Sequence, residues 1–194
     1  MDRYIAFDVE TPNCRNDRMS AIGVAVVERG HIVDSFSSVV DPETWFDGFN
    51  IALTGITPEL AASAPTFEEL WRVIGPTMLG GTLIAHNAPF DMSVLSKCLS
   101  SYCIEAPRYL DYACTVRMGR AAYPRLPDHR LDTMCGHLGF PLDHHRADSD
   151  SIACARLLID YQQKGLVAED YIRRYDTLLR KTVGAAKPLG GRVW

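Results

Sequence analysis

Two carboxylates stand at the end of an apolar segment near the start of the chain. Residues 4–10 read YIAFDVE, which places Asp8 and Glu10 two positions apart. Because side chains alternate along a strand, both carboxylates point to one face and the apolar residues between them to the other. Like charges there repel and are costly to desolvate, and a divalent cation bound by hard oxygen ligands, Mg²⁺ or Mn²⁺, removes both penalties. Taken alone, the pair is equally consistent with two solvated carboxylates at a strand end.

A third carboxylate follows in the middle of the chain, within residues 85–95, AHNAPFDMSVL. A short apolar strand ends there, Asn87 and Pro89 begin a helix, and Asp91 falls in its first turn. The helix dipole favours an acidic residue at this position, so a purely structural role is the stronger interpretation of Asp91 by itself.

A fourth carboxylate opens a late helix in residues 143–158, DHHRADSDSIACARLL. Asp150 lies near the start of the inward-facing stripe of that helix, where an acid is unusual unless it is paired or binds metal. His145 precedes it in the loop and is a candidate general base, because an unperturbed histidine titrates near neutral pH. Its neighbour His144 is the rival and ranks lower on spacing alone.

Composition narrows the classes of protein. The chain has 194 residues, of which 47% are hydrophobic, enough for one domain with a sizeable core. A net charge of -4 gives no global basic field, so phosphate binding must be local or metal-assisted. We expect a cytoplasmic protein without membrane association, because no apolar run spans a bilayer and no signal peptide is evident. The 6 cysteines show no Cys-x-x-Cys pairs and are expected to be reduced thiols.

The elements that must position these side chains follow from local patterns. We expect three strands in a meander, then alternating helices and strands, which together predict an α/β fold with a mixed sheet in a single domain. Thr66 and Glu69 have capping-box spacing at the start of one helix. The strands are predicted over residues 4–10, 20–28, 31–40, 82–85 and 109–112, and the helices over 66–78, 89–100, 113–121, 130–138, 147–163 and 168–181.

The ordered set FDVET, AHNAPFD and HHRADSDS resembles the DEDDh 3′–5′ exonuclease family, which includes the epsilon proofreading subunit of bacterial DNA polymerase III. The resemblance covers residues 4 to about 160 and implies a ribonuclease-H-like fold, with an antiparallel meander and parallel strands flanked by helices. It leads us to expect an exonuclease domain over residues 1–165. A C-terminal helix and an irregular tail over residues 166–194 would pack on that domain or extend from it.

The resemblance also implies roles for individual residues. Asp8, Glu10, Asp91 and Asp150 would hold two divalent cations, Mg²⁺ or Mn²⁺, and His145 would deprotonate the attacking water. The implied reaction releases nucleoside 5′-monophosphates from the 3′ end of a nucleic acid. The implied substrate-binding residues are Glu10, Thr11, Thr54, Gly55, Ile56, Asn87 and Phe90.

One departure from the family pattern concerns the grip on the terminal nucleotide. The family's usual His-Gly-Ile turn is Thr54-Gly55-Ile56 here, so the glycine and the apolar residue are present and the histidine is not. Our hypothesis is that Ile56 packs against the terminal base and that Phe90 lines the same pocket. Ordinary core packing of both residues is equally consistent with the sequence.

The expected substrate is a single-stranded 3′ end, with DNA favoured in a proofreading or repair role. One alternative is an RNA-trimming exonuclease of the same family, and another is a non-catalytic adaptor that binds nucleic acid. An adaptor would be expected to have lost some of the four acidic residues, yet all four are present. A DNA polymerase is a candidate partner, but the short segment after the catalytic part favours a free-standing enzyme or a detachable subunit. One of Arg117, Arg120, Arg125 and Arg130 is expected to contact the phosphate backbone, and His86, His129 and His137 are expected to be structural.

Overall fold

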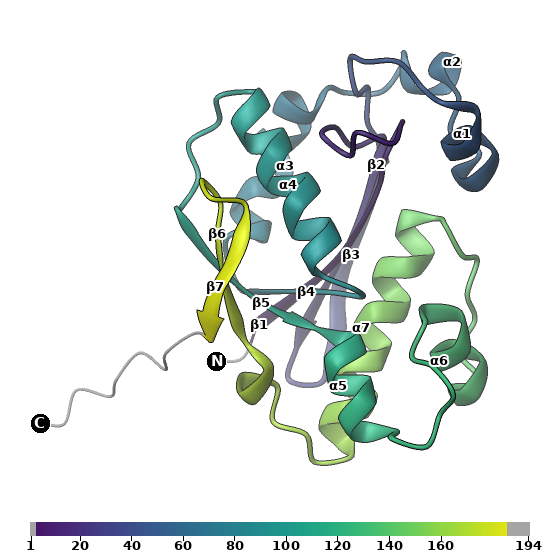
Figure 1. Ribbon diagram of the computed structural model, residues 1–194, viewed down its shortest axis with the longest axis vertical. Helices are drawn as coiled ribbons and strands as arrows, with labels where there is room; N and C mark the ends of the chain where they lie inside the picture. Colours follow the sequence, from purple (N-terminus) through teal and green to yellow (C-terminus); the bar gives the residue numbers. More distant parts are fainter. Residues whose placement is uncertain (1–2, 186–194) are drawn as a thin grey trace, which may run out of the picture.

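The computed structural model describes residues 3–185, which contain one seven-stranded mixed sheet in the order β3-β2-β1-β4-β5-β6-β7 (Figure 1). β1, β2 and β3 form an antiparallel meander, and β4 and β5 run parallel to β1. The predicted α/β fold is therefore confirmed. The strands are β1 (Arg3–Glu10), β2 (Ala21–Glu28), β3 (His31–Val39), β4 (Thr82–Ala85), β5 (Tyr109–Cys114), β6 (Arg173–Asp176) and β7 (Lys181–Ala185).

The helices agree closely with the periodic segments of the sequence. Thr66 caps α3 through a capping box with Glu69, as their spacing predicts. The long connection between β3 and α3 contains two short helices, α1 and α2, in a segment where no helix or strand is predicted from the sequence. The helices are α1 (Gly48–Thr54), α2 (Pro58–Ala61), α3 (Phe67–Met78), α4 (Pro89–Ser101), α5 (Thr115–Ala122), α6 (Leu131–Leu138), α7 (Ala147–Gln163) and the 3₁₀ helix η1 (Ala168–Tyr171).

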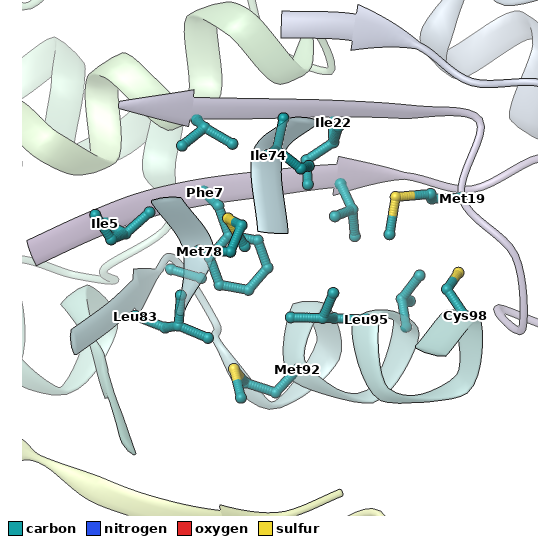
Figure 2. Packing of buried hydrophobic residues seen from close by; sticks show 14 of the residues in the cluster. Ile5, Phe7, Met19, Ile22, Ile74, Met78, Leu83, Met92, Leu95 and Cys98 are labelled. Carbon is teal, nitrogen blue, oxygen red and sulfur yellow. The ribbon is translucent and has the colours of Figure 1, made fainter. Parts of the chain in front are cut away.

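Both faces of β1 are covered, which makes it the rigid centre of the molecule. Ile5 and Phe7 are fully buried against α3 and α4 in one hydrophobic cluster, which Figure 2 shows from close by. Tyr4 and Ala6 face the other side, where they join a second cluster with α5, α6 and α7. Burial on both faces explains the near-continuous apolar run of this strand, and it holds the carboxyl end of β1 in place.

The prediction of a helix over residues 168–181 is wrong. The segment forms η1, β6 and most of a hairpin with β7 instead, and β6 pairs antiparallel with β5, with Tyr109 opposite Asp176. Tyr175 is only 2% exposed, and the Asp176 carboxylate accepts hydrogen bonds from two backbone N–H groups of the hairpin turn. Pairing with β5 and burial of Tyr175 outweigh the local helical preference.

The expected irregular tail falls largely on residues 186–194, which lie outside the described part of the chain. The residues just before it, 183–185, belong to β7. None of the helices within residues 3–185 combines the length and apolarity needed to cross a membrane.

Candidate active site

The two carboxylates of β1 meet a third from α7. Asp8, Glu10 and Asp150 each offer an oxygen, and these oxygens lie within 4.8 Å of one another. The Oδ2 atom of Asp150 accepts a hydrogen bond from the backbone N–H of His145 at 3.0 Å, whereas its Oδ1 atom is buried with no partner among residues 3–185. A buried carboxylate oxygen without a partner is costly, and a cation would satisfy it. The three residues therefore fit a divalent metal ion with oxygen ligands.

The close approach of α7 to the sheet depends on a glycine of β2. Gly23 lies opposite Asp8 in the register of β1 and β2. A Cβ atom placed on Gly23 would lie 1.8 Å from the backbone oxygen of Ala147, the first residue of α7. Only glycine permits this contact, which brings the first turn of α7, with Asp150, against the carboxyl end of β1. No local pattern in the sequence marks Gly23 as part of the site.

Asp91 is the fourth carboxylate of the site. It lies in the first turn of α4, is only 2% exposed, and its Oδ1 atom accepts a hydrogen bond from the backbone N–H of Val9 at 3.3 Å. Val9 separates Asp8 from Glu10, so this bond ties α4 to the strand that carries the other two acids. Asn87, just before α4, has a φ of 64°, a left-handed conformation that asparagine tolerates better than most residues.

Burial raises the pKa of all four carboxyl groups, and repulsion from neighbouring carboxylates adds to it, from within the set for Asp8, Glu10 and Asp91 and from Asp143 and Asp148 for Asp150. Burial is the largest cause for each of them. It raises the pKa of Asp8 well above its usual value, with further contributions from Asp91, Glu10 and Asp150. The pKa of Glu10 rises to about 7 through burial and the charge of Asp150, and that of Asp150 also rises to about 7. The pKa of Asp91 is likewise raised well above its usual value. Such a cluster favours the binding of either protons or a cation.

The carboxylates open onto one cavity of about 560 Å³. Residues from β1, α1, α4, α5, α6 and α7 and from neighbouring loops line it, so only the folded chain assembles it. The sequence-predicted residues that line it are Asp8, Glu10, Thr11, Asn87, Phe90, Asp91, His145 and Asp150.

The other three predicted residues, Thr54, Gly55 and Ile56, line a neighbouring hollow of about 280 Å³ that shares Glu10 and His145 with the main cavity. Ile56 is 7% exposed and packs in a small apolar cluster with Ala21, Ala61 and Ala147. This geometry favours the core-packing interpretation of Ile56.

Thr54, which stands in place of the family's histidine, ends α1 locally. Its hydroxyl donates to the backbone oxygen of Asn50 at 2.9 Å and accepts from the backbone N–H of Ile56 at 3.1 Å. The Asn50 side chain in turn donates to the backbone oxygen of Thr11 at 2.7 Å. α1 is thereby fastened to the loop that follows β1, at the rim of the cavity.

Several residues that line the cavity had no individual signal in the sequence. Leu53 of α1 and Val116 of α5 lie on periodic positions that core packing explains equally well. His86 and His129, expected to be structural, also line the cavity. The Nδ1 atom of His86 lies 2.9 Å from the buried Thr115 hydroxyl. Burial lowers the pKa of His86 to about 4, which leaves its ring neutral near pH 7. Arg120 and Arg130, two of the four arginines expected to offer a phosphate contact, and His144, the rival of His145, line the cavity as well. The other lining residues are Val9, Asn50, Leu53, His86, Val116, Asp128, His129 and Leu131.

Comparison with known proteins identifies the chemistry of such a site. The family model RNase_T, described as exonuclease, matches residues 5–158. The PolC-type DNA polymerase III of Bacillus cereus is 32% identical over 180 residues, which cover 88% of this chain. The chain corresponds to only 12% of the length of that polymerase.

Solved structures agree with the sequence comparison. Exonuclease X, in a complex with a 5′-overhanging duplex DNA, is 28% identical with a TM-score of 0.70, and the match covers 88% of this chain and 97% of that one. The nuclease domain of 3′hExo, a DEDDh family member bound to rAMP, has a TM-score of 0.67 over 84% of this chain and 92% of that one. At 20% identity, the second comparison supports the fold alone.

Proposed function

Because this chain belongs to the RNase_T exonuclease family, we propose that it is a divalent-metal-dependent 3′–5′ exonuclease that shortens single-stranded DNA ends. One observation carries the metal-dependent part of the proposal. Three carboxylates converge within 4.8 Å, and one of their buried oxygens, Oδ1 of Asp150, has no partner among residues 3–185. A purely structural cluster of this kind would destabilise the fold, because the hydrogen bond from the His145 N–H to Oδ2 leaves Oδ1 of Asp150 uncompensated.

The chain's acids would hold the cations. Asp8, Glu10 and Asp150 form the converging set, and Asp91 adds a fourth carboxylate from α4 to the same cavity. When bound, the ions, Mg²⁺ or Mn²⁺, would supply positive charge at the scissile phosphate and make a water molecule more acidic. β1 and α7 are both anchored in the core, so the ligands are placed before the substrate arrives.

His145 would act as the general base. It lines the cavity beside Asp150 and would accept a proton from the attacking water. The water oxygen then bonds to phosphorus while the bond from phosphorus to the 3′ oxygen breaks. The departing 3′ oxygen takes a proton from solvent, which leaves a nucleoside 5′-monophosphate and a strand shortened by one nucleotide.

The terminal nucleotide would lie between α1 and α4. Leu53 is 39% exposed and Phe90 is 38% exposed, and both line the cavity that holds the acids. Exposed apolar side chains in this position are suited to stack on a base irrespective of its identity. We therefore assign the base contact to Leu53 and Phe90 rather than to Ile56. Thr11 and Asn87 lie at the same rim and would contact the sugar or its phosphate.

DNA is the favoured substrate because a DNA polymerase is 32% identical to this chain over 180 residues and a DNA-bound exonuclease is 28% identical to it. The experiment uses 5′-labelled single-stranded DNA and RNA of equal sequence, with Mg²⁺, with Mn²⁺ and with a chelator. Asp8→Ala and His145→Ala variants test the site, and Asp170→Ala, which changes an exposed acid outside the cavity, is the matched control.

We expect a metal-dependent ladder of DNA products shortened from the 3′ end, present in the control and lost in both site variants. If RNA is shortened faster than DNA, the RNA-trimming alternative would replace the proposed DNA exonuclease. Strands that bind but stay intact with either metal would contradict an enzyme and favour the adaptor.

A proofreading role is the finer part of the proposal and rests on the polymerase relatives. It predicts faster removal of a mispaired 3′ terminal nucleotide than of a paired one from the same primer and template. Equal rates on both termini would instead favour a general trimming role. Residues 1–165 are proposed to carry this chemistry, because all the cavity-lining residues lie within them.

A further inference from the structure

Two consecutive histidines stack on each other at the mouth of the cavity. The ring centroids of His144 and His145 are 4.0 Å apart, and the ring planes differ by 11°. Both side chains line the cavity that contains the carboxylates. Adjacent residues in an extended chain point in different directions, so this arrangement requires a special backbone. His145 provides it with a φ of 68°, in the left-handed region that non-glycine residues seldom adopt.

The backbone of His145 is anchored by a hydrogen bond, whereas its ring is stacked on the ring of His144. The backbone N–H donates to the Asp150 carboxylate at 3.0 Å. Within residues 3–185, neither nitrogen of the His145 ring makes a hydrogen bond. A histidine that acts as a base is ordinarily oriented by a hydrogen bond to its second ring nitrogen. The flat face of His144 is the contact that remains to restrict rotation of this imidazole.

The stacked pair is not arranged as a metal chelate. Ligand atoms of His144, His145 and Asp150 lie within 4.8 Å of one another, which by distance alone would suit an ion. Imidazole lone pairs lie in the plane of each ring, however, and the two planes are nearly parallel. Their lone pairs cannot converge on one ion unless a ring rotates out of the stack. The Nε2 atom of His144 is also 3.9 Å from the nearest Asp150 oxygen, too far for a hydrogen bond.

We propose that His144 is a positioning residue, whose ring holds the imidazole of His145 in the orientation needed to accept a proton. The proposal rests on the proposed function, in which His145 is the general base. Proton transfer needs the base within hydrogen-bond reach of the water, so an imidazole free to rotate spends less time in the reactive geometry. His144 itself contacts no reacting atom in this scheme.

Kinetics of three variants test the proposal. We expect His144→Ala to lower kcat about three- to tenfold, the range of an aromatic pair contact, with KM little changed. His144→Phe restores a flat ring without ring nitrogens and is expected to recover most of the lost kcat. His31→Ala, which removes an exposed histidine of β3 outside the cavity, is the matched control and should be unchanged. Thermal melts of each variant separate loss of kcat from loss of folding.

A spectroscopic measurement on the metal-free protein gives a readout that does not depend on activity. The ring protons of His145 should show upfield ring-current shifts in the NMR spectrum of the wild-type chain. These shifts should disappear in His144→Ala and persist in His144→Phe.

The possible results distinguish failure of the positioning role of His144 from failure of the proposed exonuclease function. Wild-type kcat in His144→Ala, or a His144→Phe variant as slow as His144→Ala, would overturn the positioning role alone. Unshifted His145 protons in the wild-type chain would overturn the stack itself. Full activity of His145→Ala would remove the general-base role of His145 and with it the positioning role of His144, whereas the exonuclease function itself would stand; absence of activity in the wild-type chain with either metal would instead overturn the proposed function.

Discussion

Replacing Glu10 by glutamine should make the metal-free protein more stable, although it removes a proposed metal ligand. The Glu10 side chain is buried, at 8% exposed, and its pKa rises from 4.5 to about 7 on folding. At about 1.4 kcal/mol per pKa unit, ionised Glu10 costs the folded state about 3 kcal/mol above neutral pH. Glutamine has nearly the same shape and carries no charge, so the variant avoids this cost.

The sign of the pH dependence follows from the direction of the shift. The folded state binds the proton of Glu10 more tightly than the unfolded state does, so the wild-type chain loses stability as the pH rises from about 4.5 to about 7. Above that window the loss is complete and constant. Glu10→Gln lacks this contribution, and the stability difference between variant and wild type should grow across the same window.

Thermal melts in chelator at about pH 4.5 and about pH 8 measure that difference. We expect nearly equal melting temperatures at the lower pH and a variant that melts about 6–12 °C higher at the upper one. Glu105→Gln, which changes an exposed glutamate outside the cavity, is the matched control and should show no such growth. Added Mn²⁺ should stabilise the wild-type chain and reverse the order of the two proteins.

A variant no more stable than the wild type at pH 8 in chelator would refute the reasoning, because Glu10 would then have a compensating partner in the metal-free fold. A difference independent of pH would also refute it, since it would locate the effect in packing rather than in charge.

Three further changes test other parts of the structure. Gly23→Ala should lower kcat about a hundredfold, because the new methyl group must push Ala147 and the start of α7 away from β1; unchanged kinetics would show that α7 can shift freely. Phe90→Ala should raise KM on short oligonucleotides about tenfold through lost stacking, and Leu53→Ala less, whereas an unchanged KM in both would remove the base contact from α1 and α4. Tyr175→Ala should lower the free energy of unfolding by about 3 kcal/mol, measured by urea titration, because the ring is buried in the sheet core; a loss under about 1 kcal/mol would mean that β6 is dispensable.

Local sequence patterns predict the directions of three of the four acidic side chains of the site. The alternation of β1 by itself predicts that Asp8 and Glu10 share a face, and the structure places them together. The helical stripe that starts at Ala147 predicts an inward Asp150, which is only 3% exposed. These predictions succeed because strand and helix periods determine side-chain direction over a few residues, whatever the rest of the chain does.

Other features depend on contacts between distant segments. Whether Leu53 or Ile56 faces the cavity is decided by how α1 is fastened to the loop after β1, through Asn50 and Thr11, and no local period encodes that. The role of Gly23 is equally invisible in sequence, since it depends on the backbone of Ala147, more than a hundred residues away.

The C-terminal segment also shows that contacts between distant segments can override a local pattern. Residues 168–181 have a local pattern suited to a helix, yet they form strands because the free edge of β5 offers backbone hydrogen bonds and a place to bury Tyr175. The sequence by itself determined which way β1 and α7 present their acidic side chains, Asp8, Glu10 and Asp150. Tertiary structure alone decided the raised pKa values, the cavity wall and the stacked histidines, because burial and charge repulsion exist only once distant segments have packed together.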